Sequence, residues 1–183
     1  RAARQQQTFF REPIGGVRRR PGSEQLTFTR DVGGSEFSQI FRFDPVESEA
    51  TMLSDGESRN GSVRWDRGGE RIAYLSTRRN GAANDIWVMR PDEPGSAELV
   101  VSATDGSHWA PVEFSEKGNR LLVRNRISKP EIRACLVDLD AGTVTVLSGG
   151  GPDKSRNVPI AFDDGNNGFW LLTNQGSEFD RLA

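Results

Sequence analysis

The sequence has one cysteine, one histidine and no long apolar run. A single cysteine, Cys135, excludes an intrachain disulfide and a zinc site built from thiolates. Its apolar surroundings, IRACLVDLD, predict a small buried side chain. No segment approaches the ~18 consecutive apolar residues of a membrane-spanning helix, so we expect no membrane span. No Gly-x-Ser-x-Gly elbow occurs, and any Ser-His-Asp arrangement would have to use His108. The residues therefore predict no catalytic site, no metal site and no cofactor.

Charge of one sign is also lacking. The chain has 24 basic and 26 acidic residues and a net charge of −2, so its overall field does not indicate a nucleic acid or an anionic membrane as a partner. Six arginines fall within the first 20 residues. They form either a basic arm or, the favoured interpretation, a solvated surface stretch. Because the chain starts at Arg1 without methionine or an apolar signal segment, we expect it to be part of a longer polypeptide.

What is abundant is glycine and a repeated pattern. The 183 residues include 20 Gly and 9 Pro, which favours many short strands and tight turns. Trp65 aligns with Phe114 at a shift of 49 residues, and Phe114 with Phe162 at a shift of 48. At a shift of 46, VRRRPGSEQLTF from Val17 aligns with VRWDRGGERIAY from Val63. Repeats of this length are typical of β-propeller blades, which have four strands.

Each copy has the same predicted order of elements. A first strand ends at an aromatic residue, except that Arg19 takes that place in the first copy. A tight turn follows, and its penultimate position needs positive φ, which suits Gly69, Gly118 and Asn166 and suits Ser23 less well. Three further apolar strands follow, and the fourth copy stops in its third strand. The sequence thus predicts an all-β fold, an incomplete β-propeller of about three and a half four-stranded blades.

The predicted boundaries follow from this register. Residues 1–16 are interpreted as the tail of a preceding blade and a linker, and residues 17–183 as the partial propeller. The blades are expected at about 17–57, 58–106, 107–154 and 155–183. A closed propeller leaves only short edges, so an open arc is expected to be part of a larger one.

Several strings resemble a known family. FTRDVGGSEFSQIFRFDP, LSDGESRNGSVRW and STRRNGAANDIWVMRPDEP resemble the N-terminal propeller of bacterial serine peptidases of the prolyl oligopeptidase family. The degenerate turn motif is shared with TolB-like propellers. The resemblance implies that an α/β-hydrolase domain, absent from this chain, carries the catalytic residues, and that the propeller limits which peptides reach them. It also implies a periplasmic or secreted protein.

Two motifs have both a functional and a structural interpretation. DLDAG and DDGNNG resemble fragments of a calcium loop, but neither has the full ligand spacing, and the repeat places both in turns. The tryptophans could form a stacking platform for sugars. Trp65, Trp87 and Trp170 occupy positions that are apolar in other copies, which predicts packing between blades, whereas Trp109 is left open.

One positional pattern predicts a binding surface. Ser58-Arg59-Asn60 and Ser155-Arg156-Asn157 occupy the same place two blades apart, and Ser107-His108-Trp109 lies between them. Strand direction places these crossing loops on the same face as Arg78 and Arg79. We call Arg59, Arg78, Arg79, His108 and Arg156 the basic rim. It would bind peptide carboxylates or acidic groups of a hydrolase domain. Alternatively, each arginine holds its own loop by bonding backbone carbonyls.

Two functions from different classes follow. The first is the non-catalytic propeller of a prolyl-oligopeptidase-type serine peptidase, which filters peptides and docks the hydrolase domain. The second is a TolB-like propeller that binds a protein partner with no enzyme attached. A lone sugar-binding propeller would depend only on the tryptophans.

Overall fold

The computed structural model describes residue 6 and residues 8–183, and it confirms the all-β prediction. The regular elements of this part of the chain are fifteen β-strands. Residues 1–5 and 7, which belong to the predicted tail 1–16, lie outside the described residues. No described segment forms a helix that is long and apolar enough to cross a membrane.

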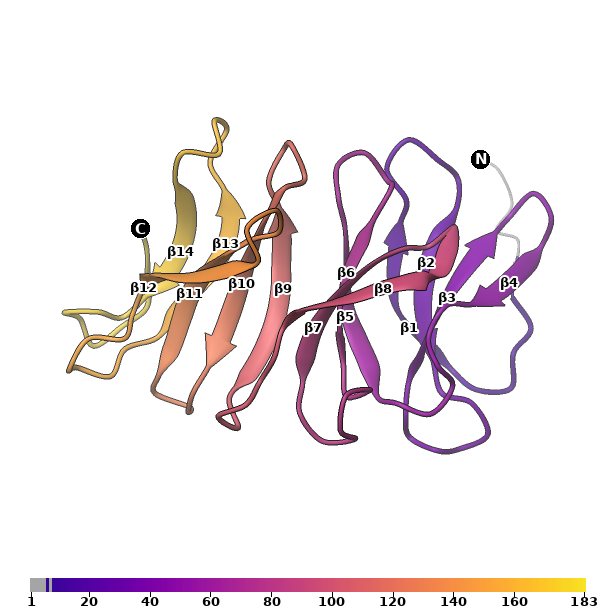
Figure 1. Cartoon of the computed structure of the whole chain (residues 1–183), viewed down its shortest axis with the longest axis horizontal. Coiled ribbons are helices and arrows are strands. Elements are labelled where there is room, and N and C mark those ends of the chain that lie inside the picture. Colours follow the sequence, from indigo (N-terminus) through magenta and orange to yellow (C-terminus); the bar gives the residue numbers. More distant parts are fainter. Residues whose placement is uncertain (1–5, 7) are drawn as a thin grey trace.

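The strands form four antiparallel sheets, each in chain order. Three sheets have four strands and the last has three. They follow one another along the long axis of the molecule, from β1–β4 near the N-terminus to β13 and β14 near the C-terminus (Figure 1). The first sheet consists of β1 (Ile14–Arg19), β2 (Leu26–Arg30), β3 (Gln39–Asp44) and β4 (Glu49–Met52). The second consists of β5 (Asn60–Trp65), β6 (Ile72–Ser76), β7 (Asp85–Arg90) and β8 (Glu93–Val101). The third consists of β9 (His108–Phe114), β10 (Arg120–Arg126), β11 (Ile132–Asp138) and β12 (Thr143–Ser148). The fourth consists of β13 (Asn157–Phe162), β14 (Phe169–Thr173) and β15 (Arg181–Leu182).

The first strand of every sheet is interrupted by a bulge. The pairing with the second strand shifts between Gly15 and Arg18 in β1 and between Gly61 and Arg64 in β5, and β9 and β13 show similar shifts. The bulge lets β1 pair from Ile14 onward, so this strand begins before the expected boundary at Val17. First strands of consecutive sheets contact one another, which brings the four bulges to one side of the arc.

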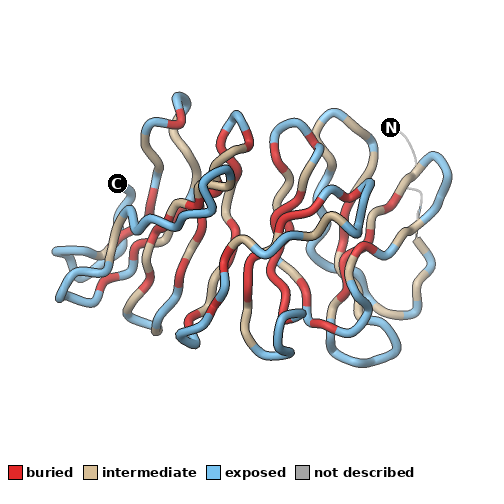
Figure 2. The backbone as a smooth tube through the Cα atoms, viewed as in Figure 1, coloured by how far each residue is buried: buried red, intermediate tan, exposed pale blue. Residues whose placement is uncertain are grey.

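The core lies between the sheets, because alternate residues of a strand face opposite neighbours. On β6, Ile72 and Tyr74 pack with Ile40 of the first sheet, whereas Ala73 packs with Leu121 and related residues of the third. Fully burying one such large apolar side chain contributes roughly 1.5–3 kcal/mol. The buried positions therefore follow the middle strands, and the exposed ones follow the loops (Figure 2).

The two outward faces of the arc differ. At the N-terminal end, Phe10 packs on Phe28 with ring centroids 5.6 Å apart, and Glu12 pairs with Arg30 at 2.8 Å, so residues 8–12 cover the first sheet. At the other end Trp170 is 50% exposed. No further sheet follows Trp170 among the described residues, so its packing between blades stays a prediction. Its counterpart in the third sheet, Leu122, is fully buried.

Neighbouring sheets are joined by a repeated arginine contact. Arg20 donates to the carbonyl of Gly69 at 2.7 Å, Arg71 to that of Gly118, and Arg120 to that of Asn166 at 2.8 Å. Each guanidinium also lies 5.4–5.8 Å from the aromatic ring that ends the next first strand. The aromatic residue, the turn and the arginine therefore recur together because they form one contact between blades.

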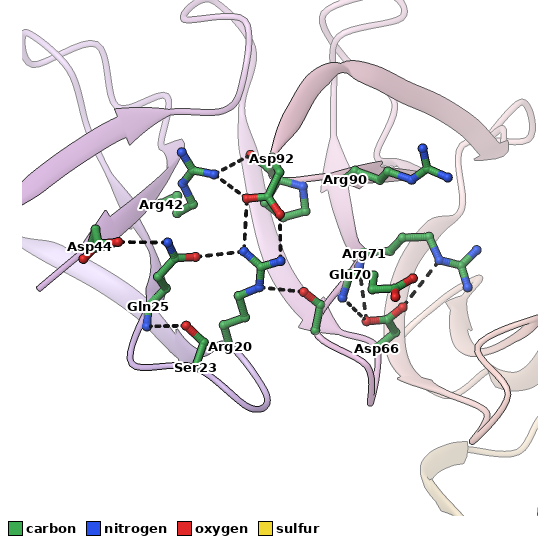
Figure 3. A network of polar contacts seen from close by, with 12 residues as sticks. Arg20, Ser23, Gln25, Arg42, Asp44, Asp66, Glu70, Arg71, Arg90 and Asp92 are labelled. Carbon is green, nitrogen blue, oxygen red and sulfur yellow. Dashed lines mark hydrogen bonds and ion pairs between the residues drawn. The ribbon is translucent and has the colours of Figure 1, made fainter. Parts of the chain in front are cut away.

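The first copy achieves this contact with different residues. Arg20 takes the role of Arg71, and both Gln25 and Asp92 accept hydrogen bonds from its guanidinium (Figure 3). The expectation that Ser23 has positive φ was wrong, since the positive φ of +70° belongs to Gly22. With Pro21 before it, Gly22 occupies the third position of a type II turn, which requires glycine.

The acidic motifs form turns, as the repeat predicted. The Asp138 carboxylate accepts hydrogen bonds from the backbone N–H groups of Asp140 and Ala141. That of Asp163 accepts one from the N–H of Asn167. These carboxylates therefore stabilise the local backbone.

Candidate functional site

The basic rim lies along one edge of the sheets. Arg59 directly precedes β5, His108 opens β9 and Arg156 directly precedes β13. Arg78 and Arg79 follow β6, whose last residue, Ser76, pairs with Asn60 at the start of β5. This edge is opposite the one with the short turns, which lie uppermost in Figure 1. The structure thus brings the five residues to the same edge, although they differ in their contacts.

Two arginines of the basic rim form ion pairs. Arg79 bonds to Asp85 at 2.7 Å, and Asp85 is fully buried. Arg79 also donates to the carbonyl of Ala103 at 3.4 Å, so it holds its loop against the next crossing loop. Arg156 pairs with Asp180 at 3.2 Å, and both side chains are partly exposed. Arg79 therefore fits the structural alternative, and Arg156 has a carboxylate partner of its own.

Two others stack on aromatic rings. The guanidinium of Arg59 lies 5.2 Å from the ring centre of Phe37, and that of Arg78 lies 4.7 Å from the ring of Trp87. Both residues are exposed. A guanidinium that stacks on a ring uses its flat face, so the N–H groups along its edge remain available for hydrogen bonds in its own plane. Arg59 and Arg78 are thus the members of the basic rim best placed to contact a partner.

His108 differs from the four arginines of the basic rim, because it lies near the positive charges of Arg124 and Arg126. It is half-buried, and its Nδ1 atom is buried without a hydrogen-bond partner. Burial lowers the pKa of His108, and the positive charges of Arg126 and Arg124 lower it further. His108 is therefore neutral near pH 7.

Further positive charges lie on β1, β5 and β10. We call Arg18, Arg64, Arg124 and Arg126 the arginine cluster. Burial lowers the pKa of Arg64, and the charges of Arg18 and Arg124 add to the effect. Burial and the charge of Arg126 lower the pKa of Arg124 in the same way. Within the described part of the chain, none of the four pairs with a carboxylate.

A cavity of about 270 Å³ lies where the cluster meets the first strands. Arg64 and Arg124 line it together with bulge residues of β5, β9 and β13, including Ser62, Val112 and Ile160. Two larger cavities, of about 340 and 530 Å³, lie between the turns of the last two sheets and beside residues 8–10. Only the smallest of these three brings together arginines that lack carboxylate partners in the described chain.

Sequence reasoning missed the arginine cluster, although two signals were present. The alignment that placed Val17 over Val63 also placed Arg18 over Arg64. Arg124 occupies the place of Leu75 in the preceding copy and Leu172 in the following one. An arginine at a strand position that other copies fill with leucine needs an explanation.

The described residues offer no arrangement for nucleophilic or metal chemistry. The only histidine of the sequence, His108, has no hydroxyl partner at its buried Nδ1. Cys135 is fully buried, and burial raises the pKa of its thiol to about 11. Among residues 6 and 8–183, no group of three or more His, Cys, Asp or Glu is placed to hold a metal ion. The described arginines without carboxylate partners are guanidinium donors of the kind that suit an anion.

Comparison with known proteins gives the fold. No protein-family model and no curated protein matches the sequence. TolB from Acinetobacter baumannii superposes with a TM-score of 0.60 at 17% identity, over 92% of this chain and 44% of that one. A chain of a nidogen/laminin complex gives 0.62 at 10% identity, over 89% and 57%. A prolyl endopeptidase gives 0.50 at 13% identity, over 93% and 34%.

The chain is an arc of a β-propeller. The open sheets and these propeller neighbours agree on that fold. The chain spans between 34% and 57% of the lengths of the three neighbours. At these identities the likeness establishes the propeller architecture, and it is shared by proteins with very different names.

Proposed function

We propose that this propeller arc is a non-catalytic binding scaffold that recognises peptides or protein segments through acidic groups. The observation that carries the proposal is the concentration of exposed or unpaired cationic side chains along one edge and on β1, β5 and β10. Arg59 and Arg78 are exposed and stacked, and the arginine cluster has no carboxylate partner in the described chain. Guanidinium groups bind carboxylates with two parallel hydrogen bonds, so such a surface suits acidic ligands.

In its finer form, the scaffold is the propeller of a prolyl-oligopeptidase-type serine peptidase. It would filter peptides and dock an α/β-hydrolase domain, and the strings around Arg30 and Arg78 support this form. The likeness to a prolyl endopeptidase is compatible with it. In that form the catalytic residues belong to the hydrolase domain, and the protein is periplasmic or secreted.

The second candidate is a TolB-like propeller that binds a protein partner with no enzyme attached. The likeness to a TolB structure, at 17% identity, is compatible with this candidate, as the likeness to a prolyl endopeptidase is with the first. The coding sequence past Ala183 separates the candidates. We expect further repeats, a Gly-x-Ser-x-Gly elbow and a later histidine if the peptidase form is right. A reading frame that ends after completing a propeller would refute it and leave the second candidate.

The binding role of the basic rim has its own test. We expect the double variant Arg59→Ala/Arg78→Ala to lose affinity for a peptide with an acidic side chain while its urea midpoint changes little. Arg90→Ala is the matched control, since Arg90 is exposed and its ion pair is with Glu93, the first residue of the next strand, β8. A large loss of stability with unchanged peptide affinity would refute the binding role and assign the two arginines to loop structure.

A further inference from the structure

The arginine cluster gathers four positive charges from three sheets, with Arg18 on β1, Arg64 on β5, and Arg124 and Arg126 on β10. Like charges at short range repel, and partial burial strengthens the repulsion because less water screens it. Arg124 donates no hydrogen bond to any described residue, and its Nε atom is buried without a partner. A buried, unpaired donor on a charged side chain is unfavourable unless something else binds it. The arginine cluster therefore lacks an acceptor for at least one buried donor, the Nε atom of Arg124.

The backbone is shaped to present these side chains. Ser62, in the bulge of β5, has φ of +53°, and its counterpart in β1, Gly16, has φ of +58°. Only the second is a glycine, so Ser62 is strained. Both bulges end at an arginine, Arg18 in β1 and Arg64 in β5. Bulges re-aim side chains and recur beside functional sites.

Arg64 is held in place by its neighbours. Its Nε donates to the carbonyl of Val112 in the next sheet, and its Nη1 donates to that of Val63, both at 3.0 Å. These two bonds orient the guanidinium, and its Nη2 has no acceptor among the described residues. Arg64 is thus fixed before a ligand arrives, which lowers the entropic cost of binding.

The cavity beside these arginines is part polar and part apolar. Arg64 and Arg124 supply the charge, while Val112, Pro159 and Ile160 supply apolar surface. Ile160 is 46% exposed although it is a large apolar residue. A free inorganic anion would gain nothing from this apolar surface, whereas a carboxylate attached to an aliphatic group would contact both parts.

We propose that this cavity binds the carboxylate of an organic acid, with Arg64 and Arg124 as its ligands and Pro159 and Ile160 against its aliphatic part. The carboxylate belongs either to the C-terminus of a peptide or to a free small acid. The proposal rests on the scaffold function and deepens it, since the arginine cluster is part of the surface that supports that function, but it depends neither on the basic rim nor on a hydrolase domain.

The first experiment measures binding by calorimetry with the 183-residue chain. The probes are N-acetyl-alanyl-leucine, its C-terminal amide, 4-methylvalerate and inorganic phosphate. We expect the free acids to bind, the amide not to bind, and the affinity to fall with added salt. If the peptide acid binds more tightly than 4-methylvalerate, the source is a peptide; equal affinities assign it to a small acid. Equal binding of acid and amide, or phosphate binding as tightly as both acids, would overturn the proposal.

The second experiment uses matched arginine variants. Arg124→Gln should weaken binding of the free acids by about tenfold or more, since hydrogen bonds to charged groups contribute at least this much. Arg90→Gln should leave the affinity unchanged. Without ligand, Arg124→Gln should unfold at the same urea concentration as the parent chain or higher, because it relieves repulsion. A purely structural arginine would lower that midpoint and leave affinity intact, which would refute the assignment.

If Arg124→Gln does not fold, the melting temperature of the unmodified chain still tests the proposal. The melting temperature should rise with N-acetyl-alanyl-leucine and not with its amide at equal ionic strength, because a ligand that binds only the folded state stabilises it. Equal shifts with both compounds would overturn the proposal independently of any variant. Failure of the rim variants would leave this result untouched, so the two proposals can fail separately.

Discussion

Replacing Gly69 by alanine is expected to destabilise the contact between the second blade and the first. Gly69 has φ of +69°, a conformation that costs an L-residue about 1–2 kcal/mol. The new Cβ would lie 2.6 Å from the carbonyl oxygen of Pro21, which is backbone of the preceding blade and cannot rotate away. Overpacking of this kind typically adds about 1–3 kcal/mol. The carbonyl of Gly69 also accepts the Arg20 hydrogen bond, so movement of the turn would weaken that contact.

The expected loss in unfolding free energy is therefore about 2–5 kcal/mol. Gly22→Ala is the matched control. Gly22 has φ of +70°, but nothing lies within 4 Å of its added Cβ, so only the backbone cost of about 1–2 kcal/mol applies. Equilibrium urea unfolding, followed by tryptophan fluorescence, gives both values. Equal losses for the two variants would refute the view that the turn at Gly69 is packed against the first blade.

Three further predictions concern buried groups. Asn157→Ala should lower the unfolding free energy by about 1–3 kcal/mol in urea titrations, because it leaves the hydroxyls of Ser148 and Thr173 without their acceptor; a neutral result would mean that water replaces the amide. Cys135, with its pKa raised to about 11, should react with a thiol reagent at pH 8 only as fast as the chain unfolds, and rapid labelling in native buffer would contradict its burial. The pKa of His108 is lowered by burial and by Arg126 and Arg124, so the unfolded chain takes up this proton first as pH falls below about 6.5. Stability should therefore decrease from that pH down to the lower folded pKa, and His108→Gln should remove this part of the urea-midpoint profile; an unchanged profile would contradict it.

The strand pattern was predictable because it depends on local rules. The predicted order of four strands a copy, with the fourth copy stopping in its third strand, matches the four sheets of the structure. The turn positions of Gly69, Gly118 and Asn166 were also correct, since positive φ restricts the residue type wherever it occurs. The turn at Gly22 was missed because a type II turn shifts the positive φ by one residue while keeping the loop length.

The candidate site was predicted only in outline. Strand direction correctly placed the basic rim on one edge, because antiparallel pairing fixes which ends of strands meet. It did not indicate that Arg79 pairs with Asp85 or that Arg156 pairs with Asp180, since those partners are chosen by loop conformation. Nor did it indicate the arginine cluster, whose members come from three different blades.

The sequence by itself determined the all-β class, the repeat and the place of each turn, because hydrophobic alternation and backbone preference act over a few residues. Only the tertiary structure decided which charges are paired. Arg64 and Arg124 are 60 positions apart in the chain. They share a cavity because Arg64 donates to the carbonyl of Val112 in β9, and Arg124 pairs with Ala110 of the same strand. Charge interactions depend on distance and burial in space, and neither is written in the order of the residues.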